Sequence, residues 1–261
     1  MGTRSTTRTR LEERVAKDRG RPRTSTVLWG GVQRLLAEAS ADRGSGELAV
    51  VDLGGGTGGL AVRVAGLGHR VVVVDPSPDA LAALERRTVE AGLSDRVRSV
   101  QGDATELSGL LDPGSADVLL CHGVLEVVDD PVAALRAAHD TLRPGGRLSL
   151  LVAQWPASVL SRVLAGQLAQ ALHVLSDEGR RWSSHDPLRR RFDRASATAL
   201  AEQAGFTVTA VEGTRTFSDL VPSASAESDD DRALLQQLES LAAAEEELLV
   251  LAAQLHLHAT R

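Results

Sequence analysis

The alternation of apolar and polar positions divides the chain into short strands and amphipathic helices. Four consecutive valines before Asp75 form the near-continuous apolar run of a strand that is buried on both faces. Similar runs recur along the chain, and segments with helical spacing separate most of them. The predicted strands are residues 48–53, 70–75, 97–101, 116–121, 147–153, 206–216 and 253–260. The predicted helices are residues 26–39, 60–67, 78–92, 131–142, 195–204 and 232–249.

This order of elements predicts an α/β fold with a Rossmann-like, doubly wound sheet. Residues 156–190 contain amphipathic stretches and then an arginine-rich segment, which interrupt the alternation. We expect them to form a helical insertion over the carboxyl ends of the strands, where ligands bind in such sheets. We expect a single domain over residues 26–261, with a basic arm at 1–25 and an acidic loop at 221–231.

Composition restricts the class of protein further. The chain is 43% hydrophobic and 25% charged, and it has no apolar run of the roughly 18 residues that span a bilayer. It also lacks the apolar segment of a secretion signal, and its single cysteine, Cys121, excludes an internal disulfide framework. We therefore expect a soluble, cytoplasmic protein without a membrane partner.

The charge is unevenly distributed around a net value of −6. Residues 1–23 are rich in arginine, a second basic cluster spans residues 180–194, and residues 227–247 are strongly acidic. Overall acidity does not prevent a local face from binding anions. The basic clusters are therefore either an anion-binding face or ordinary solvated surface.

A glycine-rich loop follows the first predicted strand. Glycines at this point let the backbone approach a ligand closely, because any Cβ would collide with it. Gly54, Gly56 and Gly59 fit the dinucleotide pattern G-x-G-x-x-G. Asp52, Gly54, Gly56 and Gly58 equally fit D-x-G-x-G-x-G, the pattern of class I methyltransferases. Asp52 either contacts the cofactor or orders the loop through backbone amides.

Residues later in the chain separate these two interpretations. Asp75 suits ribose hydroxyls in both families, but Asp103, after the third strand, suits an adenine-edge contact, and residues 142–148 resemble a turn of class I methyltransferases. The chain has no tyrosine, which excludes a short-chain dehydrogenase. We therefore expect S-adenosyl-L-methionine as cofactor and S-adenosyl-L-homocysteine as product, and a nicotinamide enzyme of another type stays as the alternative.

The histidines and the cysteine suggest different roles. His122 follows the fourth strand at its carboxyl end and is expected to contact the cofactor. We expect Cys121 to be a small core residue and His69 to be structural. No cluster of histidine and cysteine has metal-ligand spacing, so the sequence predicts no metal.

Several segments together resemble a known family. They are CHGVLEVVDDP (121–131), LRPGGRLSLL (142–151), VLW (27–29), GHRVVVVDPS (68–77), AGF (204–206), TRTFSD (214–219) and LHLHATR (255–261). In these segments the chain is similar to the bacterial tRNA uridine 5-oxyacetic acid (carboxymethoxyuridine) methyltransferases, over nearly its whole length. The resemblance implies the class I methyltransferase sheet of seven strands, with the last strands as an antiparallel hairpin and helices before the first strand.

The resemblance also implies an activity and a site. Such enzymes use S-adenosylmethionine to esterify the carboxylate of a modified wobble uridine in tRNA. Matching the motifs gives cofactor contacts at Gly54, Gly55, Asp75, Ala104, Thr105 and His122, with Arg23 as the nearest counterpart of an N-terminal arginine. With the residues proposed from the loop itself, the candidate cofactor residues are Arg23, Asp52, Gly54, Gly55, Gly56, Asp75, Asp103, Ala104, Thr105 and His122.

The chain departs from this family on the nucleic-acid side. Residues 176–181 replace a lysine-rich stretch, residues 221–231 replace a basic loop with an acidic one, and the aromatic positions near the end are lost with every tyrosine. Arg191, within RRRFDRAS, does have a counterpart in the family. The cofactor half is thus well matched, and the nucleic-acid half is eroded.

The chemical group that accepts the methyl determines which residues catalysis needs. A carboxylate, with an ordinary pKa of about 4, is already ionised at neutral pH and needs no base. An arginine fork would then orient it, with Arg190, Arg191 and Arg215 as candidates. A hydroxyl or amine acceptor would need a general base. His185, His256 and His258 are the candidates, and none is assigned as catalytic.

Three functions follow as hypotheses. The first is a carboxylate O-methyltransferase that binds a tRNA anticodon loop on the N-terminal segment and the arginines of residues 180–194. The second is a small-molecule O- or N-methyltransferase with the same fold. The third is a cofactor-binding protein without catalysis, acting through its N-terminal arm or acidic tail. The oligomeric state does not follow from the sequence.

Overall fold

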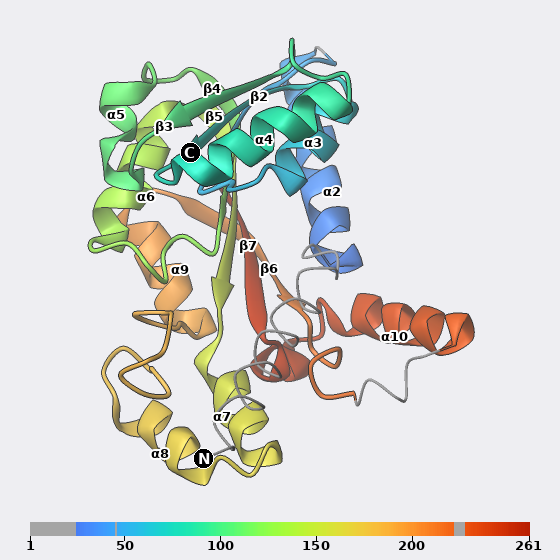
Figure 1. Cartoon of the computed structure of the whole chain (residues 1–261), viewed down its shortest axis with the longest axis vertical. Coiled ribbons are helices and arrows are strands. Elements are labelled where there is room, and N and C mark those ends of the chain that lie inside the picture. Colours follow the sequence, from blue (N-terminus) through green and yellow to red (C-terminus); the bar gives the residue numbers. More distant parts are fainter. Residues whose placement is uncertain (1–24, 45, 222–227) are drawn as a thin grey trace, which may run out of the picture.

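The computed structural model describes residues 25–44, 46–221 and 228–261, which form a single seven-stranded sheet with helices on both faces (Figure 1). The strands are β1 (Ala49–Leu53), β2 (Arg70–Asp75), β3 (Val97–Gln101), β4 (Ala116–His122), β5 (Leu142–Ala153), β6 (Thr207–Thr214) and β7 (Gln254–Thr260). The α-helices are α2 (Thr26–Arg43), α3 (Gly59–Gly66), α4 (Pro78–Glu90), α5 (Leu107–Leu110), α6 (Pro131–Thr141), α7 (Trp155–Leu164), α8 (Leu168–Ser176), α9 (Arg194–Gln203) and α10 (Asp229–Ala242). Short 3-10 helices span Ala104–Glu106 and Glu246–Leu251.

The strand order is β3-β2-β1-β4-β5-β7-β6. Strands β1 to β5 are parallel, whereas β7 lies between β5 and β6 and is antiparallel to both. Chain order runs outward from β1 in one direction and from β4 in the other, so the order reverses between these two strands. This confirms the predicted doubly wound sheet and the antiparallel pair at its end, and it places a topological switch point beside β1.

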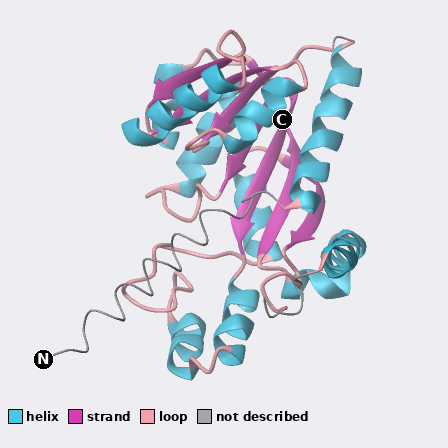
Figure 2. Ribbon diagram, turned by 45° about the vertical axis from the view of Figure 1, so that its right-hand side comes forward, coloured by secondary structure: helices cyan, strands magenta, loops and turns pink. Residues whose placement is uncertain are grey.

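Helices cover both faces of the sheet (Figure 2), and the buried apolar residues form one core on each face. On one face, Leu35 of α2 packs with Val64 of α3 and Leu84 of α4 against the valines of β1 and β2. On the other face, Leu135 of α6 and Ala201 of α9 pack against β4, β5 and β7. Both faces of the central strands are covered, which is why their sequences are almost continuously apolar.

Side-chain caps and prolines fix where the helices begin. Ser77 Oγ accepts a hydrogen bond from the Ala80 N–H, and Pro78 occupies the first turn of α4. Asp130 Oδ1 accepts a hydrogen bond from the Ala133 N–H, and Pro131 occupies the first turn of α6. A capping side chain supplies an acceptor for a backbone N–H that would otherwise be unpaired at the helix start. Proline has no backbone N–H, so it leaves no donor unpaired there. These helices begin at the predicted residues for that reason.

Two predicted helix ends were wrong. α2 continues to Arg43 instead of ending at 39, because Arg147 pairs with both Glu38 and Asp42 and holds the last turn. The predicted helix 232–249 is two elements: α10 begins at Asp229 and ends at Ala242, and a 3-10 helix follows. Carboxylates stabilise a helix N-terminus and destabilise its C-terminus. Asp229 to Asp231 therefore start α10, and Glu246 and Glu247 begin the next helix.

Two further predictions need correction around β4 and β5. The 3-10 helix and α5 lie between β3 and β4, where no helix was predicted. β5 begins at Leu142, not at 147, because Gly145 donates to the Arg261 carbonyl and Arg261 to the Gly146 carbonyl. The turn residues therefore pair at the sheet edge while Gly145 keeps a positive φ of 74°.

The insertion continues directly from the carboxyl end of β5 (Figure 1). Helices α7 and α8 pack on each other, and the chain then returns to the sheet at Phe192. The Phe192 N–H donates to the Ala153 carbonyl, and the Trp155 N–H donates to the Phe192 carbonyl, so both ends of the insertion are fixed beside β5. Helices were predicted for this segment, and its position beyond the strand ends agrees with that prediction.

Arg23, almost all of the basic arm and residues 222–227 of the acidic loop lie outside the described residues. Within the described part of the chain, no helix is both long and apolar enough to cross a membrane.

Asp117 connects three elements at the amino end of β4. Its buried carboxylate accepts from the Ala49 N–H at 2.8 Å and pairs with Arg43 of α2 and Arg143 of β5. Burial alone would raise the pKa of this carboxyl, but the hydrogen bonds from Ala49 and the two arginines outweigh burial and hold its pKa below the ordinary value.

We expect Asp117→Ala to lower the free energy of unfolding by about 2 to 3 kcal/mol, because it leaves buried donors without an acceptor. Since the folded pKa is depressed, the stabilisation is complete above the ordinary aspartate pKa and is lost as the pH falls through the folded pKa. Urea unfolding across that range measures both effects. The exposed Asp95→Ala is the control, with a change of at most about 0.5 kcal/mol. An equal loss at every pH would contradict this account.

Candidate active site

The predicted cofactor residues lie along one edge of the sheet. In the parallel register, Leu53 of β1 is opposite both Val74 of β2 and Cys121 of β4, and Asp75 is opposite Gln101 of β3. The four strands therefore end at the same level, and the loops that follow them lie side by side. Sequence positions 54, 76, 102 and 123 begin these loops, at the switch point where open α/β sheets bind ligands.

The glycine loop is shaped by close approach and by a left-handed turn. A Cβ at Gly55 would lie 2.6 Å from Asp52 Oδ2, so a side chain there would collide with the carboxylate. Gly56 has a φ of 56°, and its N–H donates to Asp75 Oδ2 at 2.9 Å. The loop can thus lie against both carboxylates only with glycine at these positions.

Asp52 is 3% exposed, and its Oδ2 has no hydrogen-bond partner among the described residues. Burial, reinforced by the nearby negative charge of Asp75, raises the pKa of Asp52 to about 7. The alternative in which this oxygen orders the loop through backbone amides has no support here, because no amide reaches it. A buried, unpaired acceptor instead suits a donor on a bound ligand.

Asp75 is buried at the end of β2 and holds the adjacent backbone. Its Oδ2 accepts from the Gly56 N–H and its Oδ1 from the Ser77 N–H, both at 2.9 Å. A carboxylate has about four acceptor sites, so two remain for ribose hydroxyls. Asp75 thus can bind the ribose while it fixes the loop.

The loop after β3 contains Asp103, Ala104 and Thr105 and is joined to the end of β2. The Gly102 N–H donates to the Asp75 carbonyl, which joins the two loops. Asp103 accepts from the Thr105 N–H at 3.0 Å and hydroxyl at 2.9 Å, and Glu106 accepts from the Asp103 N–H, which completes a capping box. The Asp103 carboxylate therefore caps a helix, and its adenine contact stays a prediction.

His122 faces a polar network. Its Nε2 lies 2.8 Å from Ser149 Oγ, which lies 2.7 Å from His256 Nε2 on β7. Burial, and then the charge of His258, lowers the pKa of His122 to about 4, so the imidazole is neutral at physiological pH. His122 is at the carboxyl end of β4 as predicted, and its contact with the cofactor stays a prediction.

Cys121 and His69 are both structural residues, as expected. Cys121 is fully buried among the strands, which confirms it as a core residue, and burial raises the pKa of its thiol. His69 is buried, and its Nδ1 accepts from the Leu48 N–H at 3.3 Å, a contact that fixes the start of β1.

The arginines proposed to orient a substrate are already engaged. Arg191 forms a bidentate pair with Asp186, and only 8% of its side chain is exposed. Arg190 donates to the carbonyls of Leu125 and Val128. These contacts give both residues a positioning role in the insertion, so the predicted contact with a substrate has no structural support.

Arg215 pairs with Asp219 at 2.6 Å, and its φ of 57° lies in the left-handed region, uncommon for arginine. The pair is partly exposed and lies after β6, beyond its carboxyl end. A surface pair of this kind is weak, so Arg215 keeps a guanidinium that can change partners.

Glu126 is a residue that the sequence did not single out. Its side chain is buried, and Oε1 accepts from the Ala153 N–H at 2.6 Å. Its backbone carbonyl accepts from the N–H groups of Arg189 and Arg190. Glu126 therefore joins the loop after β4 to the end of β5 and to the insertion. The available signal was a carboxylate in the apolar segment VLEVV, which predicts a buried acceptor.

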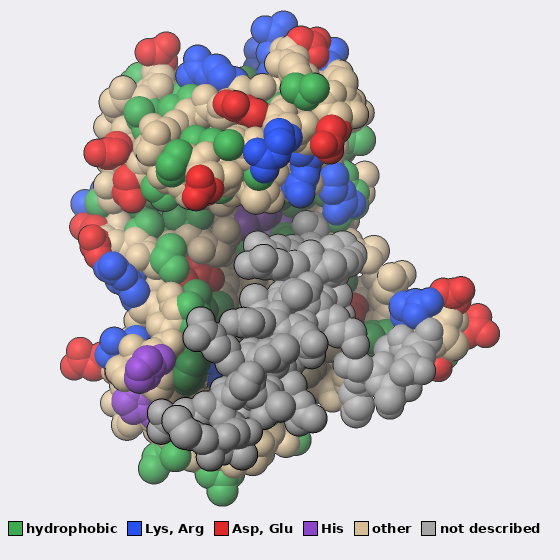
Figure 3. Space-filling model, in the orientation of Figure 1, with side chains coloured by type: hydrophobic (Ala, Val, Ile, Leu, Met, Phe, Trp, Pro, Cys, Tyr) green, Lys and Arg blue, Asp and Glu red, His purple; other side chains and the backbone are tan. Residues whose placement is uncertain are grey.

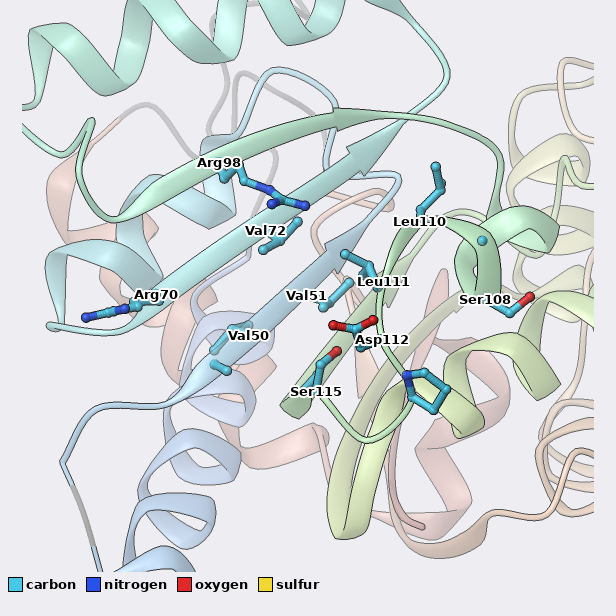
Figure 4. Close-up of a pocket in the computed structure, with 14 residues that line it drawn as sticks. Val50, Val51, Arg70, Val72, Arg98, Ser108, Leu110, Leu111, Asp112 and Ser115 are labelled. Atoms are coloured by element: carbon cyan, nitrogen blue, oxygen red, sulfur yellow. The ribbon is translucent and has the colours of Figure 1, made fainter.

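A separate cavity of about 490 Å³ lies between β1, β2 and β3 and residues 108–115 (Figure 4). It opens because α5 is a single turn and leaves this part of the sheet face uncovered. Its lining includes Val50, Arg70 and Arg98, and none of the predicted cofactor residues. Ala49 and Arg70 begin their strands, so the cavity lies toward the amino ends and away from the candidate site.

Comparison with known proteins agrees with this geometry. A family model described as a methyltransferase domain matches residues 51–150. The tRNA 5-carboxymethoxyuridine methyltransferase of Escherichia coli (strain K12) is 29% identical over 235 residues, which cover 90% of this chain and 87% of that protein. A ubiquinone biosynthesis O-methyltransferase of Xanthomonas euvesicatoria pv. vesicatoria (strain 85-10) is 38% identical over 103 residues, 39% of this chain and 41% of that protein.

Among solved structures, an S-adenosylmethionine-dependent methyltransferase from Mesorhizobium loti superposes with a TM-score of 0.60 at 19% identity, covering 90% of this chain and 98% of that one. The residues present also fit the cofactor, since the glycine loop lies against two buried carboxylates and Asp52 Oδ2 has no hydrogen-bond partner among the described residues. The chain therefore belongs to the class I S-adenosylmethionine-dependent methyltransferases and uses S-adenosylmethionine as its cofactor.

Proposed function

We propose that this enzyme O-methylates a carboxylate, that of 5-carboxymethoxyuridine at the wobble position of tRNA. The observation that carries the proposal is the similarity to the tRNA 5-carboxymethoxyuridine methyltransferase, which extends over 90% of the chain and so includes the insertion and the antiparallel strands. A match confined to the glycine loop would support only the cofactor.

The positions of the cofactor residues at the strand ends support a role for each. We propose that Asp75 binds the ribose hydroxyls, that Ala104 and Thr105 lie at the adenine, and that Asp52 and the glycine loop bind the methionine end. Bound S-adenosylmethionine supplies an electrophilic methyl group for in-line transfer to a nucleophile. The protein then has to hold the acceptor oxygen in near-attack geometry, and an ionised carboxylate requires no proton removal.

The arginines of the insertion form two groups, one engaged in internal contacts and one exposed enough to contact a polyanion. Arg190 and Arg191 hold the insertion together from inside, as described above. Arg181 and Arg189 are about half exposed. Arg189 pairs with the exposed Asp129, and such a surface pair is weak and exchanges readily for phosphate. Arg181 forms a bidentate pair with Asp177, which fixes the position of its guanidinium at the surface of the insertion. We propose that these outer arginines contact the tRNA backbone.

A second basic group lies beside the cofactor loop. Arginine side chains gather over α3 and α4 on the face shown in Figure 3. Arg63, Arg86 and Arg87 are the exposed arginines of these helices, and Arg87 donates to the Thr57 carbonyl at 2.9 Å. Arg87 thus contacts the glycine loop, and we propose that this group extends the surface available to a nucleic acid.

A separate observation supports the alternative of a small-molecule methyltransferase. The ubiquinone biosynthesis O-methyltransferase has the higher identity, 38%, but over only 39% of the chain. That similarity favours a small-molecule O-methyltransferase with this cofactor half. The two proposals differ in whether the acceptor is part of a tRNA.

The direct test is mass spectrometry of wobble nucleosides after incubation of the enzyme with S-adenosylmethionine and tRNA that carries unesterified 5-carboxymethoxyuridine. We expect the methyl ester to form in proportion to enzyme. Methylation of a small phenolic acceptor with none on tRNA would favour the alternative. Cofactor binding with no transfer to any acceptor would indicate a protein without catalysis.

The arginine proposal is tested by the salt dependence of tRNA binding. We expect Arg181→Ala with Arg189→Ala to weaken binding and to lower the slope of log affinity against log salt by about one per arginine. The exposed Arg98→Ala, which lines the distant cavity, is the matched control and should leave the slope unchanged. An unchanged slope in the double variant would remove the insertion from the tRNA surface.

Asp75→Asn should weaken S-adenosylmethionine binding by about 10- to 100-fold, the effect of losing charged hydrogen bonds worth roughly 1.5 to 3 kcal/mol. Isothermal calorimetry measures the affinity. Asp79→Asn is the control, because Asp79 is exposed in the first turn of α4. Equal affinities for the two variants would contradict a ribose contact at Asp75.

Asp52 gives the affinity a pH dependence. Because its folded pKa is raised to about 7, a proton must leave before the carboxylate can accept a hydrogen bond from a cationic ligand group. We expect affinity for S-adenosylmethionine to rise with pH up to about 7, by up to about tenfold per pH unit, and then to level off. Asp52→Asn should bind more weakly above that pH and lose this dependence. A parallel profile for the variant would exclude Asp52 as its source.

A further inference from the structure

Three polar side chains on the antiparallel strands converge on one point, on the face of the sheet that α2 covers. His256 and His258 are two residues apart on β7, so their side chains lie on the same face. Glu212 of β6 is directly opposite His256 in the register and joins them. Strands β6 and β7 lie side by side in Figure 1, close to α2 and α10.

The ligand-capable atoms of these residues form a compact triangle. His258 Nε2 lies 3.2 Å from His256 Nδ1 and 3.6 Å from Glu212 Oε2, and the third side, from His256 Nδ1 to Glu212 Oε2, is 4.0 Å. Zinc bonds to nitrogen and oxygen are about 2.0 to 2.2 Å, which in a tetrahedron separates neighbouring ligand atoms by about 3.3 to 3.6 Å. The triangle therefore has nearly the dimensions of one tetrahedral face.

Neighbouring side chains bind the atoms of His256 and Glu212 that do not belong to this triangle, as second-sphere residues do in metal sites. Ser149 Oγ is 2.7 Å from His256 Nε2, so that nitrogen can carry the proton and leave Nδ1 as a lone-pair donor. Arg34 donates to Glu212 Oε1, which orients the carboxylate and leaves Oε2. Glu212 Oε2 is buried and has no hydrogen-bond partner among the described residues.

The α2 helix leaves space at this point. A Cβ at Gly31 would lie 2.8 Å from His256 Nδ1 and 3.1 Å from Glu212 Oε2, so a side chain there would press on two of the three atoms. His256 is fully buried, whereas His258 and Glu212 keep 12% and 16% of their side chains exposed. A small ion can reach the cluster from their side.

We propose that Glu212, His256 and His258 form a binding site for a divalent transition metal of the zinc type. Oε2, Nδ1 and Nε2 are its three protein ligands, and the fourth position is available to water or to an oxygen of a bound molecule. Two histidines and a glutamate are a common zinc ligand set with one open position. The site is separate from the glycine loop, although Ser149 connects His256 to His122. The proposal departs from the expectation of no metal, which rested on the spacing of histidine and cysteine along the sequence.

The test uses the full-length chain without a histidine tag, stripped of metal with a chelator and then titrated with Co²⁺ and with Zn²⁺. We expect one ion per chain, intense ligand-field absorption of four-coordinate Co²⁺ that Zn²⁺ abolishes, and a higher Tm with Zn²⁺ because the ion binds the folded state. No ligand-field absorption, or no Zn²⁺ binding by calorimetry, would overturn the proposal.

Variants locate the ion. Glu212→Gln and His258→Gln should each weaken binding at least about 100-fold. Ser149→Ala should weaken it about 10-fold, because it removes no ligand but only a hydroxyl that His256 and His122 share. The exposed His173→Gln and His185→Gln are matched controls and should bind as the parent does. If one of the first two variants fails to fold without metal, the other and Ser149→Ala still decide the matter. Unchanged binding in the folded ligand variants would mean an adventitious surface ion and overturn the site.

Discussion

Two buried carboxylates at the ends of adjacent strands determine how the rest of the site is arranged. The parallel register brings Asp52 of β1 and Asp75 of β2 to the same edge, and the glycine loop closes over both. Asp75 accepts hydrogen bonds from two backbone N–H groups, whereas Asp52 has a raised pKa and an unpaired oxygen. Like charges that have lost water are costly unless a donor is supplied. A cationic, hydroxyl-bearing ligand supplies it, so this edge is complementary to S-adenosylmethionine.

This half of the molecule was predictable because its determinants are local. A buried strand, a terminal carboxylate and a glycine turn occupy only a few consecutive residues around Asp52 and again around Asp75. Each pattern identifies a strand end without knowledge of the fold. The helix ends were predicted less well. α2 reaches Arg43, where Gly44 caps it, and its last turn is held by contacts with Asp117 and with Arg147, more than a hundred residues away. Tertiary contacts of that kind leave no mark in the local pattern.

The insertion illustrates a different limit. The sequence displays the charges of residues 180–194 but not their partners, and folding neutralises part of the cluster. Arg191 forms an ion pair with Asp186, and Arg190 donates hydrogen bonds to carbonyls of the loop after β4. The residues that look most basic in the sequence are therefore structural at their centre and available only at their periphery. A contact with a polyanion has to be assigned from exposure, which the sequence does not contain.

The histidine and glutamate cluster depends on strand register, which is why spacing could not reveal it. The H-x-H pattern places His256 and His258 on one face, but Glu212 is more than forty residues earlier. A bulge between Val208 and Ala210 shifts β6 against β7, so that Glu212 lies opposite His256. Without that extra residue, a slip of one position would turn the Glu212 side chain to the other face. A single inserted residue in a strand thus decides whether the three polar side chains meet, and only the folded chain reveals it.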